Sequence, residues 1–285
     1  MTGIQSFTVL SFGFVGLGNM GSVMSLNLAG YAQKQGFPKV KLWNRSRGKA
    51  NELAKQGFIE VADTLESIAT DCTIIHTCLA NDEVALSVYR RILTAAKPGL
   101  ILVDHSTLYP TTSSTLHAEA EATGSSFLSY PILAVLKEYI VPTIGRAIID
   151  CGEDTRKEAL LKILGNSCIL GTIELMSENF TLAEKAGFDA RLFYEFIPWV
   201  NYGKKIRDGA FSGATGFTLP GGMKDATYIR RLGAENSTPT PVIDHAWNHL
   251  TTAKALGGEG LDWSSCAAGM RVTAGCHRLR AKTSV

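Results

Sequence analysis

The sequence has no long run of basic side chains. Its 28 Lys and Arg residues are nearly balanced by 26 Asp and Glu residues, so the formal net charge is only +2. Proteins that bind nucleic acids or anionic membrane surfaces usually concentrate positive charge on one stretch or face. The sequence therefore predicts no nucleic acid and no membrane as partners, and any phosphate group is expected to meet a local site.

The six cysteines form no CxxC pair, the spacing typical of many zinc and redox sites. They are Cys72, Cys78, Cys151, Cys168, Cys266 and Cys276. Three lie inside apolar runs, and we interpret the set as reduced core residues. The first apolar strand begins almost at Met1, which leaves no room for a targeting peptide, and no apolar stretch is long enough to span a bilayer. A cytoplasmic protein is predicted.

A metal-binding set is missing too. His245 and His249 are four residues apart, but no Glu or Cys completes a group of ligands with them. We therefore predict that both histidines lie on a helix surface, and we assign no metal.

The segment Gly16-Leu17-Gly18-Asn19-Met20-Gly21 organises the first half of the chain. An apolar strand from Phe7 to Val15 precedes it, and a helix-like pattern follows. In this motif the first glycine permits a tight turn, the second lets a pyrophosphate approach the backbone, and the third allows close packing of helix on strand. Because the context is that of a βαβ unit, the motif predicts dinucleotide binding, with the phosphates on free helix N–H groups.

No carboxylate follows the second strand, where NAD-preferring folds usually place Asp or Glu on the ribose. The residues there are Asn44-Arg45-Ser46. Arg45 can pair with a 2′-phosphate, while Asn44 and Ser46 supply neutral hydrogen bonds. The alternative is a solvated arginine in a turn. The pattern favours NADP(H) over NAD(H).

Strand and helix patterns alternate up to about residue 153, which predicts a doubly wound, mostly parallel sheet. Ligands of such sheets lie beyond the carboxyl ends of the strands. The candidates for cofactor contact there are Leu79-Ala80 and Ser106-Thr107. Ser and Thr before Pro110 equally suit a helix cap and turn.

From residue 154 the pattern changes to helices. We predict a Rossmann domain over 1–153 and an all-α domain over 154–285, with one long helix from Arg156 to Gly187 and another from Asp189 to Arg207. Lys162 and Asn166 are four apart on the long helix, at one end of an apolar face. A lysine near a helix start that reaches solvent is the alternative to a functional role.

These residues together resemble the β-hydroxyacid dehydrogenase family, which includes 3-hydroxyisobutyrate dehydrogenase and the NADP-binding domain of 6-phosphogluconate dehydrogenase. The resemblance covers most of the chain. Its anchors are Gly16 to Gly21, Asn44-Arg45-Ser46, Asp104-His105-Ser106-Thr107 with Pro110, Lys162 with Asn166, and Gly216-Phe217 followed by Lys224-Asp225.

The resemblance implies a role for several of these residues. Lys162 matches the family's catalytic lysine, Asn166 an asparagine that orients the substrate, Thr107 a cofactor contact, and Lys224 a lysine near the nicotinamide. The resemblance also implies a homo-oligomer formed through the helical domain. Gly165 replaces an asparagine of the family motif, and Leu79-Ala80 stands for a Leu-Pro pair.

A larger departure follows Pro131, where the family has a Ser-Gly-Gly substrate loop with a helix and a strand. A segment on the order of 30 residues, one helix-plus-strand unit, is absent here. Ala147 to Cys151 is expected to add an edge strand.

The resemblance implies an oxidoreductase that moves hydride between NADP(H) and a small hydroxy acid or its aldehyde or oxo counterpart, with Lys162 as general acid and base. An imine reductase on the same fold is one alternative, although such enzymes usually lack the lysine. A non-catalytic NADP(H)-binding protein is the other, because the substrate loop is missing.

Overall fold

The computed structural model describes residues 10–129, 139–141, 143–145, 147, 149–152, 154–197 and 200–276. The chain divides into two compact units, Met1–Leu161 and Lys162–Val285. This division falls inside one long helix, α7 (Thr155–Lys185). The boundary predicted at residues 153 and 154 lies just before that helix.

The first unit is built on a sheet of six strands in the order β3-β2-β1-β4-β5-β6. The strands are β1 (Phe12–Val15), β2 (Val40–Trp43), β3 (Ile59–Val61), β4 (Ile74–Thr77), β5 (Ile101–Asp104) and β6 (Ser126–Ser129). All five pairings between neighbouring strands are parallel. This is the strand order of dinucleotide-binding folds, so the predicted Rossmann architecture is confirmed. Residues 7–9 of the predicted first strand lie outside the described residues.

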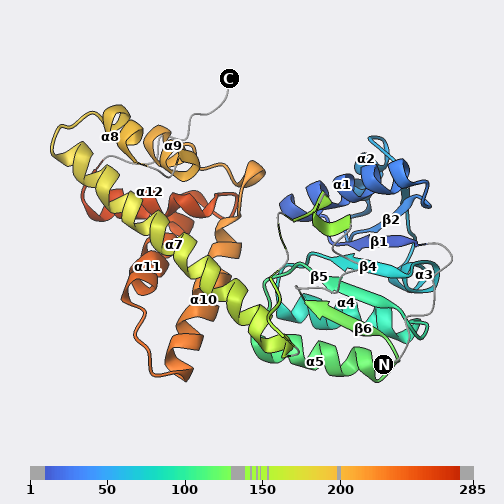
Figure 1. Cartoon of the computed structure of the whole chain (residues 1–285). Coiled ribbons are helices and arrows are strands. Elements are labelled where there is room, and N and C mark those ends of the chain that lie inside the picture. Colours follow the sequence, from blue (N-terminus) through green and yellow to red (C-terminus); the bar gives the residue numbers. More distant parts are fainter. Residues whose placement is uncertain are drawn as a thin grey trace. The chain divides into compact units, whose positions relative to one another are not determined.

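Helices cover both faces of this sheet (Figure 1). They are α1 (Asn19–Gln35), α2 (Arg47–Ala54), α3 (Leu65–Asp71), α4 (Asp82–Thr94) and α5 (Pro110–Glu121). One core contains residues of α1 and α2 such as Leu28 and Leu53, and the other contains residues of α3, α4 and α5 such as Ile68 and Ile92. Because both faces are covered, β1 and β4 are buried along their whole length.

In the family the substrate loop follows the position of Pro131. Residues 130–138 of this chain lie outside the described residues. The shortening after Pro131 therefore stays a prediction. Tyr139 and Ile140, which follow the gap, are buried in the core beside α1. Ala147 and residues 149–151, expected to extend the sheet, belong to none of its strands, so this part of the prediction was wrong.

The second unit is helical in its described residues, as predicted. Besides α7 it contains α8 (Ala190–Phe196), α9 (Val200–Asp208), α10 (Leu219–Glu235), α11 (Pro241–Gly257), α12 (Cys266–Thr273) and the short 3₁₀ turns η1 (Gly213–Thr215) and η2 (Trp263–Ser265). The single helix expected from Asp189 to Arg207 is in fact two. Its break has a local cause, because Ile197 is extended and precedes Pro198 in the sequence.

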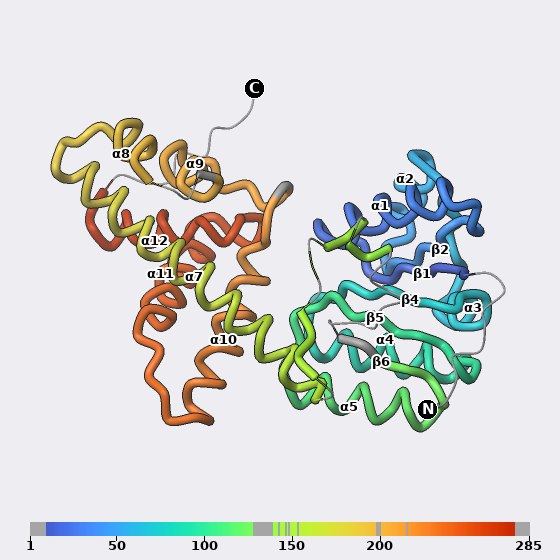
Figure 2. The backbone as a smooth tube through the Cα atoms, in the orientation of Figure 1, coloured from blue at the N-terminus to red at the C-terminus, as the bar shows by residue number. Residues whose placement is uncertain are grey.

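Helices α10 and α11 are neighbours, joined by residues 236–240 (Figure 2). Asp262 caps the turn before α12 by accepting a hydrogen bond from the Ser264 N–H. Ile173 of α7, Ile229 of α10 and Leu250 of α11 are buried.

Helix α7 corrects one expectation. It has 31 residues and a mean hydropathy of 1.4 in its most apolar window, so by length and composition alone it could cross a membrane. No such stretch was predicted. Core helices of helical domains pass the same test, and 39% of that window is buried inside the protein. Buried residues of α7 include Ile163, Leu170 and Phe180.

Candidate functional site

The glycine turn after β1 has the geometry of a phosphate cradle. Gly16 has φ +93°, and a Cβ there would lie 2.3 Å from the carbonyl oxygen of Cys78. A Cβ at Gly21 would lie 2.0 Å from the Gly16 carbonyl oxygen, whereas nothing lies within 4 Å of one at Gly18. Gly16 and Gly21 are therefore required by close packing, whereas Gly18 faces open space.

Helix α1 begins directly after this turn. Its cap residue, Gly18, has no side chain to occupy the first backbone N–H groups. Val15 is paired with Thr77 of β4, so the turn stands where the strand order reverses. An anion is best accommodated at this end of a helix, which is why a dinucleotide fits the residues present.

The end of β2 is tied to the turn by Asn44. Its Oδ1 accepts a hydrogen bond of 3.0 Å from the Leu17 N–H, and its Nδ2 donates to the Ser46 carbonyl oxygen at 3.1 Å. Asn44 therefore stabilises the glycine turn through the hydrogen bonds of its side chain. The Leu17 side chain is buried in the core, while Met20 on the first turn of α1 is 56% exposed. Asn19 begins the same helix.

A cavity of about 210 Å³ lies beside the ends of β2 and β3. Arg45 and Arg47 both line it, together with Asp63. Arg47 is held by Asp63 at 2.6 Å. Arg45 is exposed and makes no ion pair or hydrogen bond with another described residue. Arg45 is thus the arginine of this cavity that is left for an outside anion, and Ser46 is exposed next to it.

The ends of β4 and β5 are joined by Ser106. Its Oγ donates to Asp104 Oδ1 at 2.7 Å and accepts from the Leu79 N–H at 2.8 Å. Helix α5 is capped by Tyr109, so Ser106 forms a turn and does not cap the helix. Ala80 is exposed, while Thr107 is buried. Burial raises the pKa of Asp104, against the opposing effect of hydrogen bonds from Thr77 and Ser106.

In the second unit, Lys162 and Asn166 form a cluster with Asp225 of α10. Asn166 Nδ2 donates to Asp225 Oδ2 at 2.5 Å, and both residues are buried. Because a carboxylate only accepts hydrogen bonds, it fixes which way the Asn166 amide faces. Lys162 is exposed one turn away on α7. The structure thus brings together the predicted pair and an aspartate that the sequence did not assign.

Asp225 also lies beside Lys224, whose Nζ is 3.2 Å from Oδ1. This contact is an ion pair without the direction of a hydrogen bond, so Oδ1 has no hydrogen-bond donor among the described residues. Burial raises the pKa of Asp225, and the charges of Lys224 and Lys162 act in the opposite direction. The cluster presents two cations around one buried carboxylate.

The loop before α10 sets the position of Asp225. Thr218 caps α10, and Leu219 donates its N–H to the Leu261 carbonyl oxygen at 2.7 Å. A Cβ at Gly216 would lie 2.0 Å from Asp262 Oδ2, so the ion pair of Asp262 with Lys205 leaves no room for a side chain there. The Gly216-Phe217 pair singled out in the sequence is explained by this packing.

His249 differs from its prediction. His245 is exposed on α11, but His249 is buried and contacts Glu174 and Cys266. The expectation that no Glu or Cys accompanies this histidine held only for neighbours in sequence. Glu174 lies 75 positions before His249, and Cys266 lies 17 positions after it on another helix, so neither leaves a local signal.

Comparisons with known proteins agree with this geometry. Residues 11–134 match the NAD binding domain of 6-phosphogluconate dehydrogenase. An NADH-dependent oxidoreductase of Aspergillus ustus is 25% identical over 279 residues, which cover 90% of this chain and 97% of that protein.

Two solved structures share the fold. One is 3-hydroxyisobutyrate dehydrogenase of Mycobacterium tuberculosis with L-serine, with a TM-score of 0.74 at 23% identity over 93% of this chain and 100% of that one. The other is a reductive aminase from Aspergillus terreus, with a TM-score of 0.57 at 20% identity over 91% of this chain and 98% of that one.

Proposed function

We propose that the chain is an oxidoreductase of the β-hydroxyacid dehydrogenase family that reduces small aldehydes or oxo acids with NADPH, or oxidises the corresponding hydroxy acids with NADP⁺. The observation that carries the proposal is the glycine turn, with open space in front of Gly18 at the start of α1. The Lys162, Asn166 and Asp225 cluster supplies the second requirement, a proton donor with a positioned neighbour.

Each part of the nucleotide has a proposed place in the first unit. Gly16 to Gly21 would receive the pyrophosphate, and Arg45 would pair with the 2′-phosphate. Leu79, Ala80 and Thr107 stand at the ends of β4 and β5, where the nicotinamide half of a dinucleotide is bound in this fold. When bound, the cofactor supplies or accepts the hydride.

Lys162 would donate a proton in one direction of the reaction and accept it in the other. During reduction the carbonyl oxygen gains negative charge, and the Lys162 ammonium donates a proton to that oxygen as the C–O bond becomes single. During oxidation the neutral amine takes the proton from the hydroxyl group. Asn166, whose amide is oriented by Asp225, would hold the substrate oxygen. Lys224 would supply a positive charge near the nicotinamide.

A turnover screen of small aldehydes, oxo acids and cyclic imines with NADPH tests this proposal. Lys162→Ala should abolish turnover and leave NADPH binding nearly unchanged, because the nucleotide is held by the first unit. Lys157→Ala removes a cation from the same helix and serves as the control. Lys162→Arg should not restore activity, since a guanidinium does not exchange a proton near neutral pH.

The two alternatives give different results in the same screen. Turnover of imines alone, undiminished in Lys162→Ala, would indicate an imine reductase. Tight NADPH binding with no turnover of any of these substrates would indicate a non-catalytic binding protein, as the shortened stretch after Pro131 suggests.

We also propose a homo-oligomer formed through the helical unit. Large apolar side chains are exposed there, among them Leu182, Phe188, Leu192 and Phe196, the last being 87% exposed. Exposed apolar surface of this kind is typical of subunit interfaces. Light scattering after gel filtration should give more than one chain per particle, and Leu182→Ser with Phe196→Ser should shift the particle toward one chain.

The cytoplasm is the proposed location. All six cysteines are free, and Cys168 is exposed, which suits a reducing compartment. Fluorescence microscopy of a tagged full-length chain would test this.

A further inference from the structure

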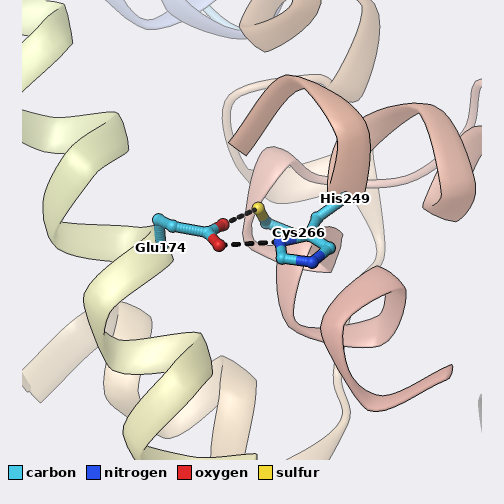
Figure 3. Close-up of side chains that lie close together, drawn as sticks. All are labelled: Glu174, His249 and Cys266. Carbon is cyan, nitrogen blue, oxygen red and sulfur yellow. Dashed lines mark hydrogen bonds and ion pairs between the residues drawn. The ribbon is translucent and has the colours of Figure 1, made fainter. Parts of the chain in front are cut away.

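Three side chains from three helices meet in the second unit. Glu174 comes from α7, His249 from α11 and Cys266 from the start of α12, and the three point toward one another (Figure 3). Glu174 Oε1 lies 2.7 Å from His249 Nδ1, and Glu174 Oε2 lies 2.8 Å from Cys266 Sγ. A carboxylate, an imidazole and a thiol therefore form one buried cluster.

Helix packing creates this cluster. A Cβ at Gly269 would lie 2.1 Å from the carbonyl oxygen of His249, so α12 approaches α11 at a distance that only glycine allows. Cys266 is one turn before Gly269 on α12, and its Sγ also lies 3.6 Å from the Ala246 carbonyl oxygen of α11. The close approach thus holds Cys266 beside His249.

Among the described residues, no lysine or arginine forms an ion pair with Glu174. Glu174 is 1% exposed, and its hydrogen-bond partners among the described residues are His249 and Cys266. A carboxylate in such surroundings is costly to keep away from water unless a cation accompanies it.

We propose that Glu174, His249 and Cys266 bind a divalent cation of the Zn²⁺ type. Carboxylate oxygen, imidazole nitrogen and thiolate sulfur are the donor atoms that Zn²⁺ takes from proteins, whereas Mg²⁺ and Ca²⁺ prefer oxygen alone. One thiolate and one carboxylate neutralise an ion of charge +2.

Binding requires a simple exchange of protons. The S–H bond of Cys266 breaks, its proton leaves to solvent, and the sulfur electron pair coordinates the ion. His249 binds through Nδ1 in the tautomer that carries its proton on Nε2. No redox change accompanies the step, so atoms and charge balance without another reactant.

The spacing of the donor atoms suits such an ion. All three lie within 4.8 Å of one another. A tetrahedral ion with bonds of about 2.0 to 2.3 Å separates its donors by roughly 3.3 to 3.8 Å. The two hydrogen-bonded pairs would open by less than about 1 Å, a shift that side-chain rotation supplies. The His249 side chain is 11% exposed, against 2% for Glu174, which gives the ion an approach from that side.

Metal titration of the purified full-length chain tests the proposal. After treatment with a chelator, the protein should take up about one Zn²⁺ per chain, and the bound ion should raise its melting temperature because it joins α7, α11 and α12. Co²⁺ should give a thiolate-to-cobalt absorption band in the unmodified protein. Absence of both stoichiometric uptake and this band would overturn the proposal, whatever the variants do.

Matched variants locate the site. Cys266→Ser and Glu174→Gln should each weaken Zn²⁺ binding by more than about a hundredfold, since even partners outside the first coordination layer are worth ten- to a hundredfold. Cys168→Ser and His245→Ala remove an exposed thiol and an exposed imidazole from α7 and α11 and should change nothing. If these two variants weaken binding equally, the ion is held at the surface and the proposed site is wrong.

Discussion

The glycine turn of the first unit and the Asn166–Asp225 pair of the second are built in opposite ways. The glycines of the turn all come from one short segment, and they are required by the backbone conformation at Gly16 and the close packing at Gly21. The pair joins residues 59 positions apart on two helices. The turn is therefore encoded locally, whereas the pair depends on how α7 and α10 pack. The following predictions break each arrangement in turn.

Gly21→Val should have the largest effect. Its Cβ would lie 2.0 Å from a backbone oxygen, which cannot move aside as a side chain can. We expect a loss of about 3 kcal/mol of unfolding free energy, the upper part of the range for overpacking, together with loss of NADPH binding. Chemical denaturation and a cofactor titration would measure both.

Gly18→Ala is the matched control, because nothing lies within 4 Å of its Cβ. Stability should stay nearly unchanged, while NADPH binding weakens since the methyl group stands where the pyrophosphate approaches. Equal destabilisation by the two substitutions would contradict the roles assigned to these glycines.

Asp225→Ala should lower kcat by about a hundredfold, because Asn166 loses the carboxylate that fixes its amide and the substrate oxygen is misplaced. NADPH affinity should change little. Thr227→Ala, at an exposed position on the same helix, is the control. Steady-state kinetics would measure kcat for each variant. An unchanged kcat in Asp225→Ala would exclude a positioning role of Asp225.

Arg45→Ala should reduce the preference for NADPH over NADH by about tenfold, the loss of one charge-assisted contact with phosphate. Arg47→Ala should do less, because Arg47 is already paired with Asp63. Dissociation constants for both cofactors would test this. Equal affinities for NADPH and NADH in the unmodified protein would be evidence against NADP(H) as the cofactor.

The smallest expected effect concerns pH. Burial raises the pKa of Asp225 above the ordinary value of 3.8, so the folded state holds this proton more tightly than the unfolded state. The contribution of Asp225 to stability is therefore present at low pH and is lost as the pH rises through its folded pKa. Asp225→Asn should flatten this part of the profile, measured as urea midpoints from acidic to neutral pH. A profile that keeps its full slope would show that Asp225 does not cause it.

The structure of the first unit was predicted from the sequence more completely than that of the second. The doubly wound sheet, the glycine turn and the position of Arg45 after the second strand follow from hydrophobic periodicity and from the backbone needs of single residues, which neighbouring residues largely determine. The break between α8 and α9 was missed although Pro198 marks it, because the apolar pattern continues across it. The strand expected from Ala147 failed because an apolar segment alone does not supply a neighbour to pair with.

The amino-acid sequence by itself determined the dinucleotide-binding fold and the helical second unit, because periodicity and local backbone geometry are properties of contiguous residues. The candidates Lys162 and Asn166 came from the family resemblance. Only the tertiary structure decided that Asp225 holds Asn166 and that His249 is buried with Glu174 and Cys266. Contacts between residues 59 to 92 positions apart arise when helices pack, and close approaches such as that of Gly269 to His249 set which side chains meet.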